Sequence, residues 1–141
     1  MREILSYEEL TELEKIALET ADLPLCQRIM AFVKFWKWYP TDFFLHTELD
    51  ANTYSKLKND RLKKPDTRTV VAMCVGLRLP FTIVEDLLQK AGMAFSNSQD
   101  DRAYRYIVMM MNGATIEECN KTLRSKGVAL LGSIKDDYIY A

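Results

Sequence analysis

The sequence predicts an all-α protein, and three observations carry this prediction. Apolar residues recur at the three- and four-residue spacing of amphipathic helices through most of the chain. Capping residues and Gly or Pro stops separate these apolar segments. No stretch of useful length alternates apolar and polar residues as a strand does. We therefore expect about seven helices with short connections.

Capping signals place the helices along the chain. Ser6 with Glu9 forms a capping box that begins an acidic helix over residues 6–20, and Thr115 with Glu118 forms a second box. A helix that begins near Pro24 is expected to run through Tyr39 and to stop before Pro40. The other expected elements lie at 41–48 (capped by Thr41), 51–59 (capped by Asp50), 67–77, 80–91, 98–111 and 116–126.

Composition excludes several classes of protein. The chain has 141 residues, of which 48% are hydrophobic and 11% aromatic, with five Gly and four Pro. This content is sufficient for a core and is unlike that of a disordered chain. No apolar run reaches the roughly 18 residues of a membrane span, and charges occupy the N-terminus where a signal peptide would be apolar. We expect a cytosolic protein that does not contact a membrane.

Cysteine and histidine positions argue against an enzyme or a metal protein. Cys26, Cys74 and Cys119 lie far apart without a C-x-x-C pair, which does not fit a disulfide framework or a zinc site. The one histidine, His46, lies in an apolar stretch typical of a helix rather than of a catalytic turn. Phosphate-binding, dinucleotide-binding and nucleophile-elbow motifs are absent. We expect no catalytic residue, no metal and no cofactor.

Two short helices in the middle of the chain have the spacing of a helix-turn-helix. The segments 41–48 and 51–59 are separated only by a turn at Leu49 and Asp50. In the second segment, Tyr54 and Leu57 lie three residues apart and are expected to face inward. The opposite face carries polar residues suited to base edges and phosphates. These residues are Asn52, Ser55, Lys56 and Asn59.

Charge is distributed unevenly along a chain whose formal net charge is −1. Residues 1–22 carry two basic and seven acidic side chains, whereas residues 50–68 carry six basic and three acidic ones. The local net charges are therefore −5 and +3. A basic stripe on a reading helix and its following loop is the electrostatic pattern expected for DNA binding. We expect Lys58, Lys63 and Lys64 of this stripe to contact phosphates.

Residues 49–60, the Lys63-Lys64-Pro65 stretch and the apolar segment 68–77 resemble the lambda-repressor-like helix-turn-helix domain of the Xre family. The resemblance covers residues 24–92 and implies five short helices that bind double-stranded DNA as a dimer, usually as a repressor. It implies base-reading positions at Ala51, Asn52, Ser55 and Lys56. It implies phosphate contacts at Thr53, Asn59 and Arg61.

The sequence departs from this family pattern at four positions. Phe44 stands where a small Ala is usual at the helix crossing, and a bulky ring there is expected to widen or shift the crossing. Glu48 replaces the turn Gly, and Asp60 replaces the Gly after the reading helix. Pro40 replaces a phosphate-binding Gln, which removes one backbone anchor.

The organisation that follows is an acidic N-terminal helix at 1–22, a helix-turn-helix domain at 23–92, and a C-terminal helical pair with a tail at 93–141. The first hypothesis is a sequence-specific regulator that occupies an operator as a homodimer. The alternative is a protein-interaction adaptor or antitoxin-like module that keeps the scaffold without DNA binding. A protein partner is expected at the acidic helix or at exposed aromatics.

Two apolar clusters have alternative interpretations. Phe32, Trp36, Tyr39 and Phe43 follow helical spacing and are expected in the core. Either Phe35 or Trp38 is then exposed and available for a dimer or partner surface. Residues 109–111 are three consecutive methionines on one helix, so at least one points away from the core. They serve either core filling or a dimer contact.

Overall fold

A computed structural model of the chain describes residues 4–132, and within them every regular element is a helix. The all-α prediction is confirmed, and the described residues form eight helices where about seven were expected. The helices are α1 (Tyr7–Glu19), α2 (Leu25–Phe35), α3 (Pro40–Thr47), α4 (Ala51–Lys58), α5 (Thr67–Gly76), α6 (Phe81–Lys90), α7 (Gln99–Met110) and α8 (Ile116–Ser125).

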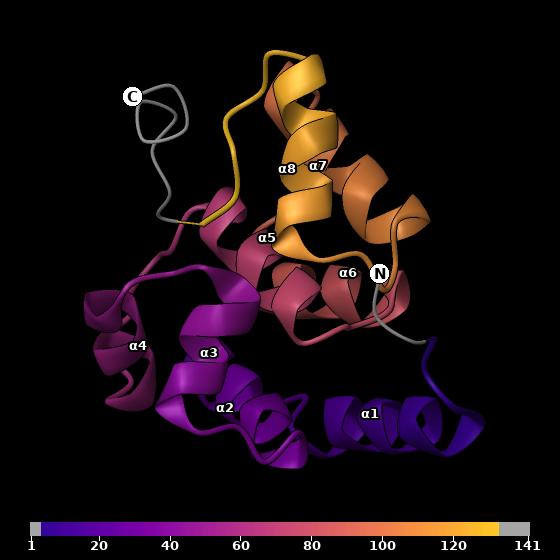
Figure 1. Cartoon of the computed structure of the whole chain (residues 1–141). Coiled ribbons are helices and arrows are strands. Elements are labelled where there is room, and N and C mark those ends of the chain that lie inside the picture. Colours follow the sequence, from indigo (N-terminus) through magenta and orange to yellow (C-terminus); the bar gives the residue numbers. More distant parts are fainter. Residues whose placement is uncertain (1–3, 133–141) are drawn as a thin grey trace.

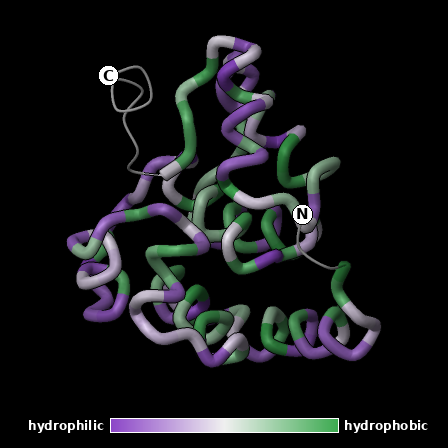
Figure 2. The backbone as a smooth tube through the Cα atoms, in the orientation of Figure 1, coloured by the Kyte–Doolittle hydropathy of each residue, from purple (hydrophilic) through white to green (hydrophobic). Residues whose placement is uncertain are grey.

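The helix α5 lies near the centre of the molecule (Figure 1). Its residues 70–74 are all buried, and it contacts α3, α6, α7 and α8. The tube through α5 is largely apolar whereas that through α4 is largely hydrophilic (Figure 2). The helices α4 and α1 lie at opposite edges of the molecule (Figure 1). The acidic α1 therefore does not cover the outer face of α4.

Most helix boundaries follow the predicted caps. The amide of Glu9 donates to the Ser6 hydroxyl at 3.0 Å, and the Glu9 carboxylate accepts from the Ser6 amide. The Thr115–Glu118 box is formed in the same way. Asp50 accepts from the Thr53 amide at 2.8 Å, which confirms the predicted cap of α4. Local hydrogen bonding therefore fixes these ends.

The end of α2 differs from the prediction. The helix stops at Phe35, because Lys37 adopts a left-handed backbone with φ of 56°. Trp38 then turns back and stacks on His46 at 5.1 Å, so both Phe35 and Trp38 are partly buried. Within this aromatic cluster, Tyr39 is exposed, at 76%, although it was expected in the core.

The next helix, α3, also begins one residue earlier than predicted. Pro40 occupies its first turn, where a missing N–H costs nothing. The Asp42 carboxylate accepts from the Tyr39 amide at 2.7 Å, so Tyr39 rather than Thr41 is the capping position.

A buried arginine joins three helices. Arg28 on α2 is 1% exposed, and its Nη2 donates to the Asp86 carboxylate of α6 at 2.7 Å and to the Ala17 carbonyl of α1 at 2.9 Å. Lys90 lies 3.2 Å from the same carboxylate. Burial acts to raise the pKa of Asp86, but the hydrogen bonds and charges of Arg28 and Lys90 outweigh it and hold that pKa below its usual range.

A glycine allows α3 to approach α5 closely. A Cβ at Gly76 would lie 2.8 Å from the His46 carbonyl oxygen and 2.8 Å from the Thr47 methyl carbon. The small residue at a close crossing of this domain is therefore on α5 rather than on α3. This approach positions the start of the turn that leads into α4.

The C-terminal helices agree with the sequence in part. Met109 and Met110 on α7 are exposed and Met111 is partly buried, as the expected helical spacing requires. The tail after residue 132 lies outside the described residues. Among residues 4–132, no helix combines the length and apolar character needed to cross a bilayer.

Substituting Asp86→Asn should destabilise the protein at neutral pH by about 2 kcal/mol, because it leaves the buried Arg28 without its ionic partner. The folded-state pKa of Asp86 is depressed, so its contribution is present above the ordinary Asp pKa of about 3.9 and is lost as the pH falls through the folded value. Urea unfolding at pH 7 and pH 3 should show the gap between wild type and variant shrinking at pH 3. Glu85→Gln, an exposed neighbour on α6, is the control; a gap that is equal at both pH values contradicts the prediction.

Substituting Gly76→Ala should destabilise the protein by about 1–3 kcal/mol through overpacking against His46 and Thr47. Helix propensity alone predicts the opposite, a gain of up to about 1 kcal/mol. Thermal and urea unfolding measure the sign. Gly92→Ala is the comparison, since a Cβ there meets nothing within 4 Å and only the left-handed backbone opposes it. A stabilised Gly76→Ala protein would show that α3 does not approach α5 as closely as described.

Candidate nucleic-acid interface

The turn between α3 and α4 is tightly organised. Glu48 ends α3 in a left-handed conformation with φ of 54°. The Thr47 hydroxyl donates to the Phe43 carbonyl at 2.7 Å and accepts from the Leu49 amide at 3.2 Å. Asp50 then caps α4, and the hydrogen bond from the Thr53 amide is the main cause that lowers the pKa of Asp50. The chain thus enters α4 in a defined direction.

Aromatic rings fill the space between α3 and α4. Leu57 is buried and Tyr54 is half-buried, which confirms the predicted inward face of α4. The Tyr54 ring lies 4.9 Å from Phe43 and 5.8 Å from Phe44, measured between ring centroids. The bulk of Phe44 at the crossing is therefore accommodated by edge contacts with Tyr54.

The opposite face of α4 is open. All four expected base-reading residues, Ala51, Asn52, Ser55 and Lys56, are exposed. Of the expected phosphate contacts on this helix, Lys58 and Asn59 are exposed and Thr53 is half-buried. The Asn59 amide group donates to the Ser55 carbonyl at 2.9 Å, so part of its hydrogen-bonding capacity is used within the helix.

The loop after α4 carries the remaining expected phosphate contacts. Arg61, Lys63 and Lys64 are all exposed. The loop turns at Asp60, whose φ is 57°, and the Arg61 amide closes it on the Lys56 carbonyl at 2.7 Å. This bond holds Arg61 at the C-terminal end of α4, and the two lysines follow it in the loop.

Two residues of α2 hold this loop, and sequence reasoning missed both. Gln27 donates through Nε2 to the Asp60 carboxylate at 3.2 Å, and the Cys26 thiol donates to the Leu62 carbonyl at 3.5 Å. Burial is the main cause that raises the pKa of the Cys26 thiol. These pairs are 33 and 36 residues apart in sequence, and neither belongs to a recognisable motif.

The six cations of residues 50–68 are exposed, and none of them forms an ion pair within residues 4–132. The three acids of the same stretch are all engaged by hydrogen bonds. Asp50 and Asp66 each cap a helix, and Asp60 accepts from Gln27. The acids keep their charge, so the stretch has a net charge of +3, and its six cations face solvent outside any ion pair of the described residues. It is available for an anionic partner such as a phosphate backbone.

The last described residue, Gly132, lies against the turn between α3 and α4. A Cβ at Gly132 would lie 2.9 Å from the Glu48 carbonyl oxygen, so residue 132 packs directly on the turn. Burial is the main cause that raises the pKa of Glu48, and the charge of Glu117 adds to it. The end of the described chain thus packs against the turn between α3 and α4.

No protein-family model, curated protein or solved structure matches the chain. The chemistry that this site can perform is therefore inferred from its side chains. Among residues 4–132, no group of three or more His, Cys, Asp or Glu side chains is placed to hold a metal ion. His46 is a half-buried helix residue stacked on Trp38. What the described surface offers is a short helix with polar and cationic side chains directed outward.

Proposed function

We propose that this chain is a sequence-specific double-stranded DNA-binding transcriptional regulator, acting as a repressor in the cytoplasm. The observation that carries the proposal is the outer face of α4, which exposes Asn52, Ser55 and Lys56 beside cations without ion-pair partners. Asn pairs bidentately with adenine, and Lys donates to guanine in the major groove. Binding to an operator, rather than catalysis, would be the mechanism.

The order and turns of α2–α6 support the resemblance to the lambda-repressor-like domain. The left-handed residues Glu48 and Asp60 stand where the family has Gly, so the backbone keeps the geometry while the residue differs. As a homodimer, the protein would place two copies of α4 in successive major grooves about 34–36 Å apart. The exposed Tyr106, Met109 and Met110 of α7 are candidates for the dimer surface.

The adaptor alternative requires the face of α4 to be covered or engaged by protein. Within the described residues Asn52 and Lys56 are exposed, and α1 lies at the far edge of the molecule (Figure 1). This exposure favours DNA as the partner of α4. A protein partner of the acidic α1 is compatible with it, because α1 and α4 present separate surfaces.

Substituting Lys56→Ala should weaken binding to the cognate duplex by about 1–3 kcal/mol and relax the preference at one base pair. The duplex is first selected from a random pool with the full chain, and affinity is then measured by fluorescence anisotropy. Lys121→Ala, an exposed lysine on α8, is the matched control and should bind as wild type does. If no duplex from the pool gives a salt-dependent complex, the proposed function is wrong.

Substituting both Lys63→Gln and Lys64→Gln should weaken binding to all duplexes alike. Each lost phosphate contact should reduce the slope of log affinity against log salt by about 0.9. Titrations of specific and non-specific duplexes between 50 and 200 mM salt measure this slope. If the double variant keeps the wild-type slope, the loop does not contact the phosphates.

A further inference from the structure

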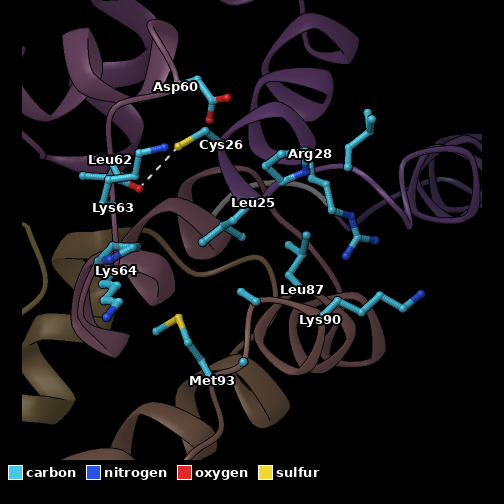
Figure 3. Close-up of a pocket in the computed structure, with 15 residues that line it drawn as sticks. Leu25, Cys26, Arg28, Asp60, Leu62, Lys63, Lys64, Leu87, Lys90 and Met93 are labelled. Carbon is cyan, nitrogen blue, oxygen red and sulfur yellow. Dashed lines mark hydrogen bonds between the residues drawn. The ribbon is translucent and has the colours of Figure 1, made fainter.

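An open cleft lies behind the basic loop. It has a volume of about 530 Å³ and is bounded by the start of α2, the loop between α4 and α5, and the end of α6. Leu25, Leu87 and Met93 face the same space, with Lys64 at its edge (Figure 3). Its size and largely apolar wall with a few polar groups are those of small-molecule sites.

The charges of this cleft favour an anion. Arg28 and Lys90 at one end share Asp86, and Asp60 accepts from Gln27. Lys63 and Lys64 at the other end have no carboxylate partner within residues 4–132. An acidic ligand would therefore find two unpaired ammonium groups at the rim.

Arg28 adds no free charge to this preference, because it is 1% exposed and is paired with Asp86. Its Nη1 atom is buried without an acceptor, although the other guanidinium nitrogens are bonded. The wall of the cleft therefore combines hydrocarbon with the two ammonium groups of Lys63 and Lys64.

We propose that this cleft binds a small amphiphilic carboxylate, with its hydrocarbon body against the leucines and Met93 and its carboxylate at Lys63 and Lys64. Burial of the hydrocarbon removes apolar surface of both partners from water. The carboxylate accepts a charge-assisted hydrogen bond from one or the other ammonium group. A neutral molecule of the same shape gains only the first of these, so the site discriminates by charge.

The position of the cleft links this ligand to DNA, and this step rests on the proposed function. Lys63 and Lys64 are also the expected phosphate contacts of the loop. The loop is tied to α2 by Gln27 and Cys26, so the cations on it cannot move far from the cleft. A carboxylate held by these lysines would compete with phosphates for the same charges. The ligand should therefore weaken DNA binding, and by linkage DNA should weaken ligand binding to the same extent.

The first experiment titrates the full chain with octanoate by calorimetry, with octanol as the uncharged control. Octanoate should bind, octanol should bind more weakly, and the Lys63→Gln/Lys64→Gln variant should bind octanoate at least about tenfold more weakly, as expected on loss of charge-assisted bonds. The matched control is Lys34→Gln/Lys121→Gln, which removes two exposed lysines elsewhere. Amide NMR shifts induced by octanoate should centre on Leu25, Leu62 and Met93. Absence of binding, equal binding by the lysine variant, or shifts elsewhere overturns the site.

The second experiment repeats the DNA titration at saturating octanoate. Loss of one or two phosphate contacts should lower the affinity for DNA by about 3–10-fold at moderate salt. If octanoate binds at the cleft but the affinity for DNA is unchanged, the competition is overturned. If octanoate binds and no duplex does, the proposed function fails while the site stands. If a duplex binds and octanoate does not, the site fails while the function stands.

Discussion

A buried cation holds the arrangement of this protein together. Arg28 requires a carboxylate from α6 and a carbonyl and a hydroxyl from the end of α1, so all three helices must be in place at once. Desolvation of such a charge costs several kcal/mol, and a buried ion pair rarely adds net stability. Arg28 therefore contributes mainly by fixing the relative positions of the three helices rather than by adding net stability. It fixes the acidic α1 on the side of the domain away from α4, which leaves the outer face of α4 uncovered (Figure 1).

The basic stretch at residues 50–68 contains three acidic residues, and each of them is engaged in a hydrogen bond of the fold rather than in an ion pair. Asp50 and Asp66 serve as helix caps, and Asp60 is tied to Gln27, so each local negative charge is bound to a donor of the fold. The neighbouring cations are left facing solvent. Interactions between exposed charges are screened over about 10 Å at 0.1 M salt. A phosphate backbone at α4 would therefore meet mainly the nearby lysines and arginines rather than the acids of α1.

Local signals predicted most of the local structure, whereas the contacts between helices could not be predicted. Caps such as Ser6 and Asp50 were found because a side chain bonds an amide three residues away. The predicted end of α2 was wrong because nothing in the sequence indicates that the backbone of Lys37 is left-handed. Arg28 and Gly76 escaped notice because their partners lie on other helices. In the candidate interface, the exposed face of α4 followed from helical spacing, whereas the anchoring of its loop by Gln27 depends on a contact across 33 residues.

The departures from the Xre pattern can be weighed by their energies. A non-Gly residue in a left-handed conformation costs about 1–2 kcal/mol in the folded state. Replacing Gly also removes about 0.4–1 kcal/mol of unfolded-state entropy. For Glu48 and Asp60 the second effect offsets part of the first, so the net cost stays below about 2 kcal/mol per residue and does not rule out the scaffold. The bulk of Phe44 is compensated by its edge contact with the Tyr54 ring.

Pro40 is the departure without such compensation, because it lacks both an N–H and a polar side chain at the first turn of α3. Under the proposed function, a loss of affinity for DNA relative to the family should therefore arise at the start of α3 rather than on the outer face of α4.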